Sequence, residues 1–426
     1  MSEIKRVAII GGNRIPFMRS NTAYSNASNM EMLSATLQGL VERFNLQGQR
    51  LGEVAAGAVM KHSRDFNLAR EATLNSGLAP ETPAYDVQQA CGTGLEAAIL
   101  VANKIALGQI DAGIAAGTDT ASDVPIALNE KYRRMILDLN SAKTLGARLK
   151  ILLRFRPSFI LPELPANAEP RTGMSMGQHC ELMAKYWNIS REAQDELTWH
   201  SHQNLIAAYQ RGFFDDLISP FNGVERDGIM RDTPLEKLAR LKPAFDRENG
   251  TLTAANSTTL TDGAAAVLLA SEDWAAEHRL PVQAYLSFSE VAAVDFYSQG
   301  SDSEGLLMAP AYAVPRLLER AGISLQDFDF YEIHEAFAAQ TLCTIKAWED
   351  AEFCKNKLGL DSPLGSIDRN KLNVNGSSVA TGHPFAATGP RIISTLAKLL
   401  EQKGQGRGLI SICAAGGQGV TAILER

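Results

Sequence analysis

The chain contains 426 residues, of which 45% are hydrophobic and 21% are charged, proportions typical of globular proteins. This composition excludes a disordered, a collagen-like and a small disulfide-stapled protein. Its 41 Lys and Arg residues against 48 Asp and Glu residues give a net charge of -7, which argues against general nucleic-acid binding. No segment reaches the roughly 18 apolar residues of a membrane span, and the first residues lack a signal-peptide core, so we expect a cytoplasmic protein.

Short apolar segments rich in Val, Ile and Ala recur along the chain and predict buried β-strands. They cover residues 6–12, 53–60, 84–90, 112–119, 264–271, 328–335, 371–377, 408–415 and 420–424. Amphipathic helices lie between several of them, as shown by the spacing of Leu95, Ile99, Ala102, Ile105 and Ala106 along one helical face. Strands that alternate with helices predict an α/β protein with largely covered sheets.

The region from residue 124 to 247 interrupts this alternation, and we interpret it as an insertion. Its first part, residues 131–156, is rich in Lys and Arg, with Asp138 as the single acid and apolar residues between the charges. This pattern predicts a basic amphipathic surface. Such a surface suits a partner subunit or an anionic membrane, and it is equally typical of an ordinary solvated helix face.

Five cysteines at wide spacings, without a CxxC pair, argue against a disulfide framework and a zinc ribbon. Cys91 is the most notable, because it ends a predicted strand and is followed by Gly92, Thr93, Gly94 and then a helix. The free N–H groups and the dipole of a helix N-terminus stabilise a thiolate, so the sequence predicts a lowered Cys91 pKa and a nucleophilic role. The alternative is a buried cysteine that acts as a small hydrophobic side chain.

Three further reactive side chains occupy comparable positions. His334 closes the predicted strand 328–335, His383 lies in a Gly-rich loop that leads into a helix, and Cys413 ends the predicted strand 408–415 before a second Gly-rich segment. Open α/β sheets place their sites at or just beyond the carboxyl ends of strands. We therefore expect Cys91, His334, His383 and Cys413 to form one catalytic site.

Two cofactor classes are not expected. The residues His179, Cys180, His200 and His202 lack the spacing of a metal site, so the sequence predicts no bound metal. The early segment VAIIGGNRIPF lacks the GxGxxG pattern of a dinucleotide site, so it does not predict NAD binding.

The motifs around these reactive residues resemble those of the thiolase family, and the likeness covers essentially the whole chain. The family's nucleophile motif resembles QQACGTGLEA around Cys91, its histidine motif resembles NVNGSSVATGHPFAATG around His383, and its C-terminal motif resembles CAAGGQG from Cys413. Most thiolases have Asn at the start of the segment that is HEAFA here. His334 in its place resembles the thiolase subunits of fatty-acid oxidation multienzyme complexes.

The resemblance implies a five-layered αβαβα fold with two similar core domains and an inserted loop domain that binds coenzyme A. Residues 1–123 and 248–288 would form the N-terminal core domain, residues 124–247 the loop domain, and residues 289–426 the C-terminal core domain. The resemblance also implies a homodimer or dimer-based assembly, a hydratase/dehydrogenase partner subunit, and a peripheral membrane contact. Coenzyme A would be a substrate, with no tightly bound cofactor.

The implied activity is that of a 3-ketoacyl-CoA thiolase of fatty-acid β-oxidation. Cys91 would carry the acyl group, His383 would activate it, and Cys413 would handle the proton on carbon. His334, His383 or an ordered water would donate to the enolate oxygen, and the backbone N–H groups of Cys91 and Ala415 would form a second oxyanion hole.

The resemblance further implies coenzyme A contacts at Thr258, Arg231 and Ser175, which are also compatible with ordinary loop residues. The sequence departs from the usual family pattern at Ser377, Ala415 and His179. A biosynthetic acetoacetyl-CoA thiolase remains an alternative, as do a decarboxylating ketoacyl synthase and a non-catalytic lipid-binding relative. Cys413 argues against the synthase, because decarboxylation supplies a carbanion without a second thiol.

Overall fold

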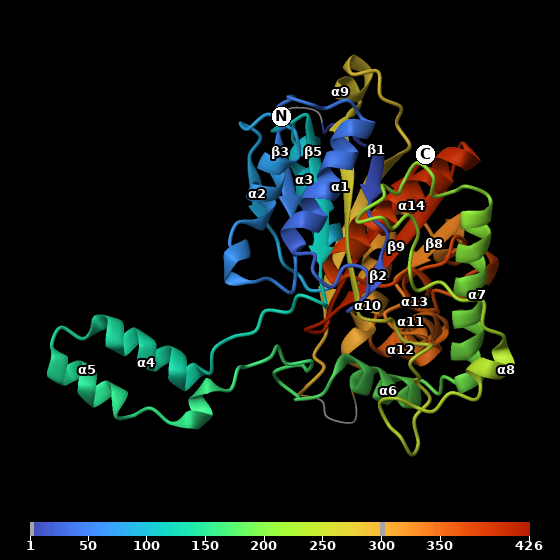
Figure 1. Ribbon diagram of the computed structural model, residues 1–426. Coiled ribbons are helices and arrows are strands. Elements are labelled where there is room, and N and C mark those ends of the chain that lie inside the picture. Colours follow the sequence, from blue (N-terminus) through green and yellow to red (C-terminus); the bar gives the residue numbers. More distant parts are fainter. Residues whose placement is uncertain (1–3, 299–302) are drawn as a thin grey trace.

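The computed structural model describes residues 4–298 and 303–426 as a mixed α/β structure (Figure 1). Nine strands form one continuous sheet in the order β4-β3-β5-β6-β1-β7-β10-β9-β8, and β2 pairs with β6 beside this path. The strands are β1 (Val7–Arg14), β2 (Met18–Arg19), β3 (Glu53–Ala56), β4 (Ala84–Asp86), β5 (Ala112–Asp119), β6 (Thr261–Ser271), β7 (Ala284–Ala293), β8 (Phe330–Ile333), β9 (Arg407–Ala414) and β10 (Gln418–Glu425).

The sheet consists of two halves that meet at β1 and β7. These strands are joined by only two residue pairs, Ala8 with Tyr285 and Ile9 with Ala284. In the first half β3 is parallel to β4 and β5, and in the second half β8 is parallel to β9, whereas the other pairings are antiparallel. The carboxyl ends of the parallel strands therefore lie at defined edges of each half, where loops can carry functional side chains.

Helices cover both faces of each half. The helices α3 (Thr93–Ala106) and α14 (Thr388–Lys403) pack between the halves, in a core cluster that also contains residues of β1, β6, β9 and β10. The outer face of the first half is covered by α1 (Asn29–Arg43) and α2 (Leu68–Asn75). The outer face of the second half is covered by α10 (Ala309–Ala321) and α11 (Ala338–Glu349). The structure thus has five layers in which helices and sheet alternate, as expected.

The inserted region is largely helical and includes a part that extends away from the body. In Figure 1, α4 (Glu130–Ser141) and α5 (Leu145–Leu152) form a separate hairpin, and Met135 is the one buried residue that the two helices contain. The remaining helices are α6 (Met176–Tyr186), α7 (Arg191–Gln210), α8 (Leu235–Leu238), α9 (Glu272–Glu277), α12 (Ala351–Asn356) and α13 (Ser378–Thr381). Within the described ranges, no helix has both the length and the apolar character needed to cross a membrane.

The predicted elements agree with most of the sheet, and two differences have clear causes. Residues 371–377 do not form a strand, because Asn373 and Gly376 adopt left-handed conformations (φ 47° and 75°) that a strand does not tolerate. Their backbone is bound instead by side chains of α7: the Ser377 amide donates to Ser201 Oγ at 3.0 Å, and Asn204 Nδ2 donates to the Asn373 carbonyl at 3.1 Å. The strand β7 was not expected, because many of its residues are only partly buried and it lacks a continuous apolar run.

Candidate active site

Cys91 lies in a tight turn between β4 and α3. The preceding residue, Ala90, has a left-handed backbone (φ 47°), a conformation that typically costs a residue with a Cβ roughly 1–3 kcal/mol. Thr93 holds the turn, since its hydroxyl donates to the Ala90 carbonyl (2.7 Å) and accepts from the Gln89 amide (2.8 Å). Because α3 begins at Thr93, Cys91 stands directly before a helix N-terminus, as the sequence predicts.

The pKa of the Cys91 thiol is raised, not lowered. Burial raises it to about 12, and the charges of Asp119 and Glu169 act in the same direction. The N–H groups of Ala415 and of Cys91 itself donate to the sulfur and oppose this shift. The predicted lowered pKa is therefore wrong, because desolvation outweighs the effect of the helix N-terminus. Cys91 rests as a thiol and needs a base to become a nucleophile.

His383 has the properties of such a base. Its Nδ1 shares a hydrogen bond with Thr388 Oγ1 (2.6 Å) at the start of α14, and its backbone amide donates to Thr261 Oγ1 (2.8 Å). Burial, followed by the charge of Arg391, lowers the pKa of His383 to about 3, so the ring is neutral at physiological pH. Its Nε2 is buried and has no hydrogen-bond partner within the described residues. A neutral ring with an unoccupied Nε2 can accept a proton.

His334 follows β8 directly and is fully buried. Its backbone amide donates to the Ser411 carbonyl on β9 (2.8 Å), so pairing with the sheet fixes the position of the His334 backbone. Its Nδ1 shares a hydrogen bond with Ser378 Oγ (2.7 Å). Burial, with the nearby His383 and Arg391, holds the pKa of His334 well below its usual value. Like that of His383, its Nε2 has no partner in the described part of the chain.

Cys413 ends β9 with 1% of its surface exposed. Burial, and then the charge that Cys91 carries as a thiolate, raise the pKa of Cys413 well above its ordinary value. Cys413 therefore rests as a thiol with a proton to give, and its electrostatic interaction with Cys91 places the two sulfurs in one environment.

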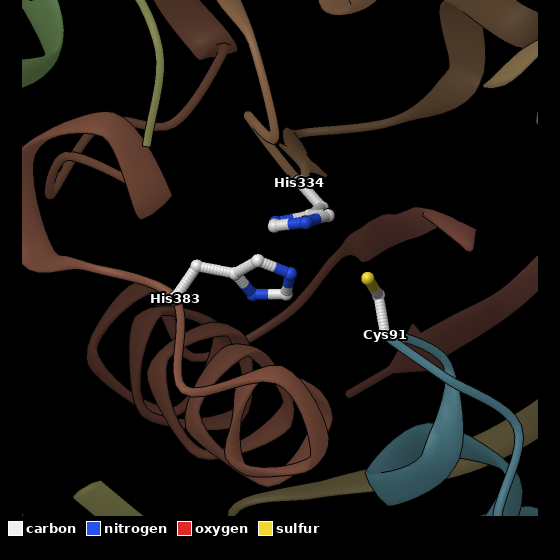
Figure 2. A group of neighbouring side chains, drawn as sticks. All are labelled: Cys91, His334 and His383. Atoms are coloured by element: carbon white, nitrogen blue, oxygen red, sulfur yellow. The ribbon is translucent and has the colours of Figure 1, made fainter. Parts of the chain in front are cut away.

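The four reactive side chains come from distant parts of the sequence. Figure 2 shows Cys91, His334 and His383 pointing toward one another. The Cys91 sulfur and one ring nitrogen of each histidine all lie within 4.8 Å of one another. The rings of His334 and His383 have centroids 4.2 Å apart. The structure thus brings together the residues that the sequence predicts for one site.

Glycines allow the two halves of this site to approach each other. A Cβ at Gly94, in the first turn of α3, would lie 2.3 Å from the Ala386 carbonyl oxygen and 2.3 Å from Pro390 Cδ. A Cβ at Gly389, in the first turn of α14, would lie 2.2 Å from the Leu95 nitrogen. All three distances are too short for real atoms, so this contact between α3 and α14 requires glycine. It sets the Cys91 turn against the His383 loop.

Several supporting residues were not identified from the sequence. Asp119, at the end of β5, accepts hydrogen bonds from the amides of Met60 (2.8 Å) and Ala386 (2.9 Å), which ties the His383 loop to the first half of the sheet. Asp119 could have been identified from the sequence, because it lies at the carboxyl end of a strand that was predicted correctly. Ser378 and Arg391 surround His334 only through the tertiary fold, and the sequence pattern gives no comparable signal for them.

The three residues predicted to contact coenzyme A have different environments. Thr258 lies against the loop that follows His334, since its amide and its hydroxyl both donate to the Ala336 carbonyl (3.1 and 3.0 Å). Ser175 is the N-cap of α6 and accepts from the Gln178 amide (3.2 Å), so its hydroxyl has a structural role. Arg231 is exposed at the surface. Partial desolvation lowers the pKa of its side chain, and the charge of Arg19 lowers it further, which indicates a local concentration of positive charge.

The other histidines and cysteines of the insertion form no comparable site. Within the described ranges, the one group of three potential metal ligands is Cys91, His334 and His383. His179 instead shares a hydrogen bond with Thr172 Oγ1 (2.7 Å), and Cys180 belongs to a hydrophobic core cluster.

Comparison with known proteins decides the family. The model of the thiolase N-terminal domain matches residues 7–273, and that of the thiolase C-terminal domain matches residues 289–426. The chain belongs to the thiolase family. It is 40% identical over 427 residues to a 3-ketoacyl-CoA thiolase of Yersinia pestis (strain Pestoides F), a match that covers 99% of this chain and 97% of that protein. A 3-ketoacyl-CoA thiolase of Yersinia pseudotuberculosis (strain YPIII) matches equally well.

Solved structures agree with this assignment. An acetyl-CoA acetyltransferase of Bacillus anthracis aligns with a TM-score of 0.82 at 30% identity, and human mitochondrial 3-ketoacyl-CoA thiolase aligns with a TM-score of 0.81 at 26% identity. Both alignments cover 100% of either chain. The thiolase fold expected from the sequence is confirmed, and the protein is an acyltransferase of this family.

Proposed function

We propose that this protein is a 3-ketoacyl-CoA thiolase that cleaves 3-ketoacyl-CoA with free coenzyme A. The products are acetyl-CoA and an acyl-CoA shortened by two carbons. The observation that carries the proposal is the convergence of a thiol, Cys91, and two neutral, buried imidazoles with unoccupied Nε2 atoms, in electrostatic contact with a second thiol, Cys413. Acyl transfer between thioesters requires these groups: a nucleophile, a base, an oxyanion donor and a proton source.

In the first half-reaction, His383 Nε2 accepts the proton of Cys91, and the sulfur attacks the 3-keto carbon. Collapse of the tetrahedral intermediate breaks the bond between C2 and C3, which leaves an acyl group on Cys91 and the enolate of acetyl-CoA. The Cys413 thiol then protonates C2. A thiol with a raised pKa suits this step, because it keeps its proton until a strongly basic carbanion is present.

In the second half-reaction, the thiol of coenzyme A attacks the acyl group on Cys91. The proton of that thiol passes to the Cys413 thiolate left by the first half-reaction, the acyl-CoA leaves, and the Cys91 thiolate regains its proton from His383. The N–H of Ala415 already donates to the Cys91 sulfur, which places it next to the thioester carbonyl of the acyl enzyme. One such donor typically contributes about 2.7–4 kcal/mol in the transition state.

The degradative activity is preferred to the biosynthetic alternative because the curated relatives at 40% identity are named 3-ketoacyl-CoA thiolases. The same residues would also condense two acetyl-CoA molecules, and the Bacillus anthracis neighbour is named an acetyltransferase. Thiolysis of 3-ketoacyl-CoA substrates of short, medium and long chain by the purified protein tests the proposal. Activity confined to the four-carbon substrate would favour the biosynthetic alternative, and no activity on any length would refute the proposal.

We further infer that Thr258 and Arg231 contact coenzyme A. Thr258 lies beside the catalytic loop, where the pantetheine arm has to pass to reach Cys91. Arg231 and Arg19 together supply positive charge for a phosphate group of the coenzyme. Ser175 has less support, because capping of α6 already occupies its hydroxyl.

We also infer that the protein acts as a dimer-based assembly in fatty-acid β-oxidation, with a hydratase/dehydrogenase subunit as its partner.

We infer in addition that the α4–α5 hairpin is a docking surface. The support for this inference is the exposure of the hairpin. Leu145 and Leu153 are 84% and 79% exposed, an unusual state for large apolar side chains. Arg133 and Arg134 pair with Glu130, whereas Lys150 and Arg156 have no ion pair among the described residues. The hairpin thus presents apolar side chains and net positive charge.

A further inference from the structure

The side chain of His334 has one occupied and one unoccupied nitrogen. Its Nδ1 lies 2.7 Å from Ser378 Oγ, and its Nε2 is buried with no partner in the described part of the chain. One nitrogen of the ring lies within 4.8 Å of the Cys91 sulfur and of a nitrogen of His383. A neutral imidazole carries one proton, on either Nδ1 or Nε2. The two forms have opposite abilities in the pocket, because Nε2 either donates a hydrogen bond or accepts one.

The second partner of Ser378 decides between the two forms. Arg391, on α14, donates from Nη2 to Ser378 Oγ at 2.9 Å. An arginine side chain is only a donor, so Ser378 Oγ must accept this hydrogen bond. The hydroxyl proton of Ser378 then needs an acceptor of its own, and within the described residues the one that its Oγ contacts is His334 Nδ1. Since all three side chains are buried, no bulk water offers another.

Electrostatics favours the same form. The charge of Arg391 lies close enough to contribute to the lowered pKa of His334, after burial and His383. A nearby cation disfavours an N–H dipole that points toward it, and it also disfavours a second proton on the ring. Burial lowers the pKa of Arg391 itself to about 10, so Arg391 remains protonated at physiological pH.

We propose that Arg391 and Ser378 are positioning residues that fix His334 in the tautomer with its proton on Nε2. His334 is thereby a hydrogen-bond donor into the pocket, and His383 is left as the single proton acceptor. In the proposed reaction, on which this catalytic consequence rests, the His334 N–H would stabilise the enolate oxygen. Two adjacent imidazoles would thus have distinct roles, set by the hydrogen-bond partners of each ring and not by the rings themselves.

The tautomer can be measured without any turnover. In full-length protein labelled with ¹⁵N-histidine, long-range proton–nitrogen correlation distinguishes a neutral ring protonated on Nε2 from one protonated on Nδ1, and the His334→Asn variant identifies the signals of His334. We expect the Nε2–H form in the wild type and a shift toward the Nδ1–H form in Ser378→Ala. An Nδ1–H ring in the wild type would overturn the proposal, even if thiolase activity is demonstrated.

Kinetics provides the second measurement. Loss of an oxyanion donor typically lowers kcat about 10²–10³-fold, so its misorientation in Ser378→Ala should lower kcat for thiolysis about 10–100-fold, with KM for 3-ketoacyl-CoA nearly unchanged. Ser378→Thr keeps the hydroxyl and should recover most of the loss. Thr395→Val serves as the matched control, because it removes another buried hydroxyl, on α14, whose one partner among the described residues is the Arg391 carbonyl. Equal losses in Ser378→Ala and Thr395→Val would mean that Ser378 is merely structural.

Discussion

The imidazole rings of His334 and His383 lie with their centroids 4.2 Å apart and their planes inclined at 48°. Each ring uses Nδ1 for a hydrogen bond to a hydroxyl, Ser378 in one case and Thr388 in the other. Neither ring carries a second proton at physiological pH, because burial lowers both pKa values. Two uncharged rings can share this small volume without the repulsion that two imidazolium ions would suffer. In the proposed reaction the pair would therefore act through hydrogen bonding and proton transfer, without a fixed charge.

Cys91 is predicted to be the acylated residue. After incubation of the wild type with acetyl-CoA or a 3-ketoacyl-CoA, peptide mass spectrometry should find the acyl group on the peptide that contains Cys91. The Cys91→Ala variant should show no acyl adduct and no thiolysis. Stable acylation at another cysteine alone would contradict the assignment.

Cys413 and His383 are predicted to act in different steps. Cys413→Ala should still be acylated at Cys91 by acetyl-CoA, but it should lose thiolysis and condensation by about 10²-fold or more, because no thiol protonates or deprotonates C2. In His383→Ala the acylation of Cys91 should itself be lost. The two variants are compared by the amount of acyl enzyme formed in a single turnover and by the steady-state rate. Near wild-type turnover by Cys413→Ala would show that the assigned role is wrong.

The raised pKa of Cys91 predicts the pH dependence of its alkylation. A thiol with a pKa of about 12 is largely protonated throughout the neutral range, and its thiolate fraction rises about tenfold for each pH unit. Iodoacetamide should therefore modify Cys91 faster at each step from pH 7 to pH 10, whereas an ordinary thiol levels off above a pKa of about 8.5. The other four cysteines are buried, so the modified peptide identifies the reaction. A plateau below pH 8 would mean that the helix N-terminus lowers the Cys91 pKa by more than burial raises it.

The contact between α3 and α14 predicts a strong effect of one methyl group. Gly94→Ala places a Cβ at 2.3 Å from the Ala386 carbonyl oxygen, so the helices must separate, and forced overpacking typically costs about 1–3 kcal/mol. We expect a lower midpoint of thermal or urea unfolding and a loss of acylation, since the Cys91 turn moves with α3. Gly146→Ala, in α5, is the control, because nothing lies within 4 Å of the position that its new methyl group would take. Equal unfolding midpoints for both variants would contradict this packing argument.

The α4–α5 hairpin is predicted to bind an acidic surface. Replacing Arg148, Lys150, Arg154 and Arg156 with Ser removes four positive charges and should weaken sedimentation with anionic lipid vesicles. The attraction should also fall between 0.1 M and 1 M salt, where the Debye length shortens from about 10 to 3 Å. Thiolysis of a short 3-ketoacyl-CoA should remain nearly unchanged, because the hairpin extends away from the site (Figure 1).

A matched control variant removes the same number of positive charges from elsewhere on the surface. The exposed residues Arg50, Arg240, Arg316 and Lys355 are suitable for replacement with Ser. If both variants bind vesicles and a purified partner subunit as the wild type does at either salt concentration, the hairpin is an ordinary solvated surface. Loss of short-chain activity in the first variant alone would instead indicate contact with the coenzyme A phosphates.

The sequence alone was sufficient for the alternating α/β architecture, and it singled out Cys91, His334 and His383, which the structure places within 4.8 Å of one another. Strand β5 has the predicted bounds, because a run of small and β-branched residues buried on both faces has few alternatives to a central strand. Cys91 and His383 were identifiable because glycine-rich turns between strands and helices are local features of the chain. The strand predicted at 371–377 failed, because left-handed backbone at Asn373 and side-chain hydrogen bonds from distant residues are not visible as a hydrophobic pattern.

Only the tertiary structure decided the electrostatics of the site. The helix N-terminus next to Cys91 is a local feature and predicts a lowered pKa, but burial is a property of the whole fold, and it determines the actual direction. Likewise, Ser378 and Arg391 lie 44 and 57 residues from His334 in the sequence, and their contacts form only when α13 and α14 pack against β8. Local sequence specified which groups can react, whereas long-range packing set their protonation, because desolvation and hydrogen-bond partners depend on every segment that surrounds a buried side chain.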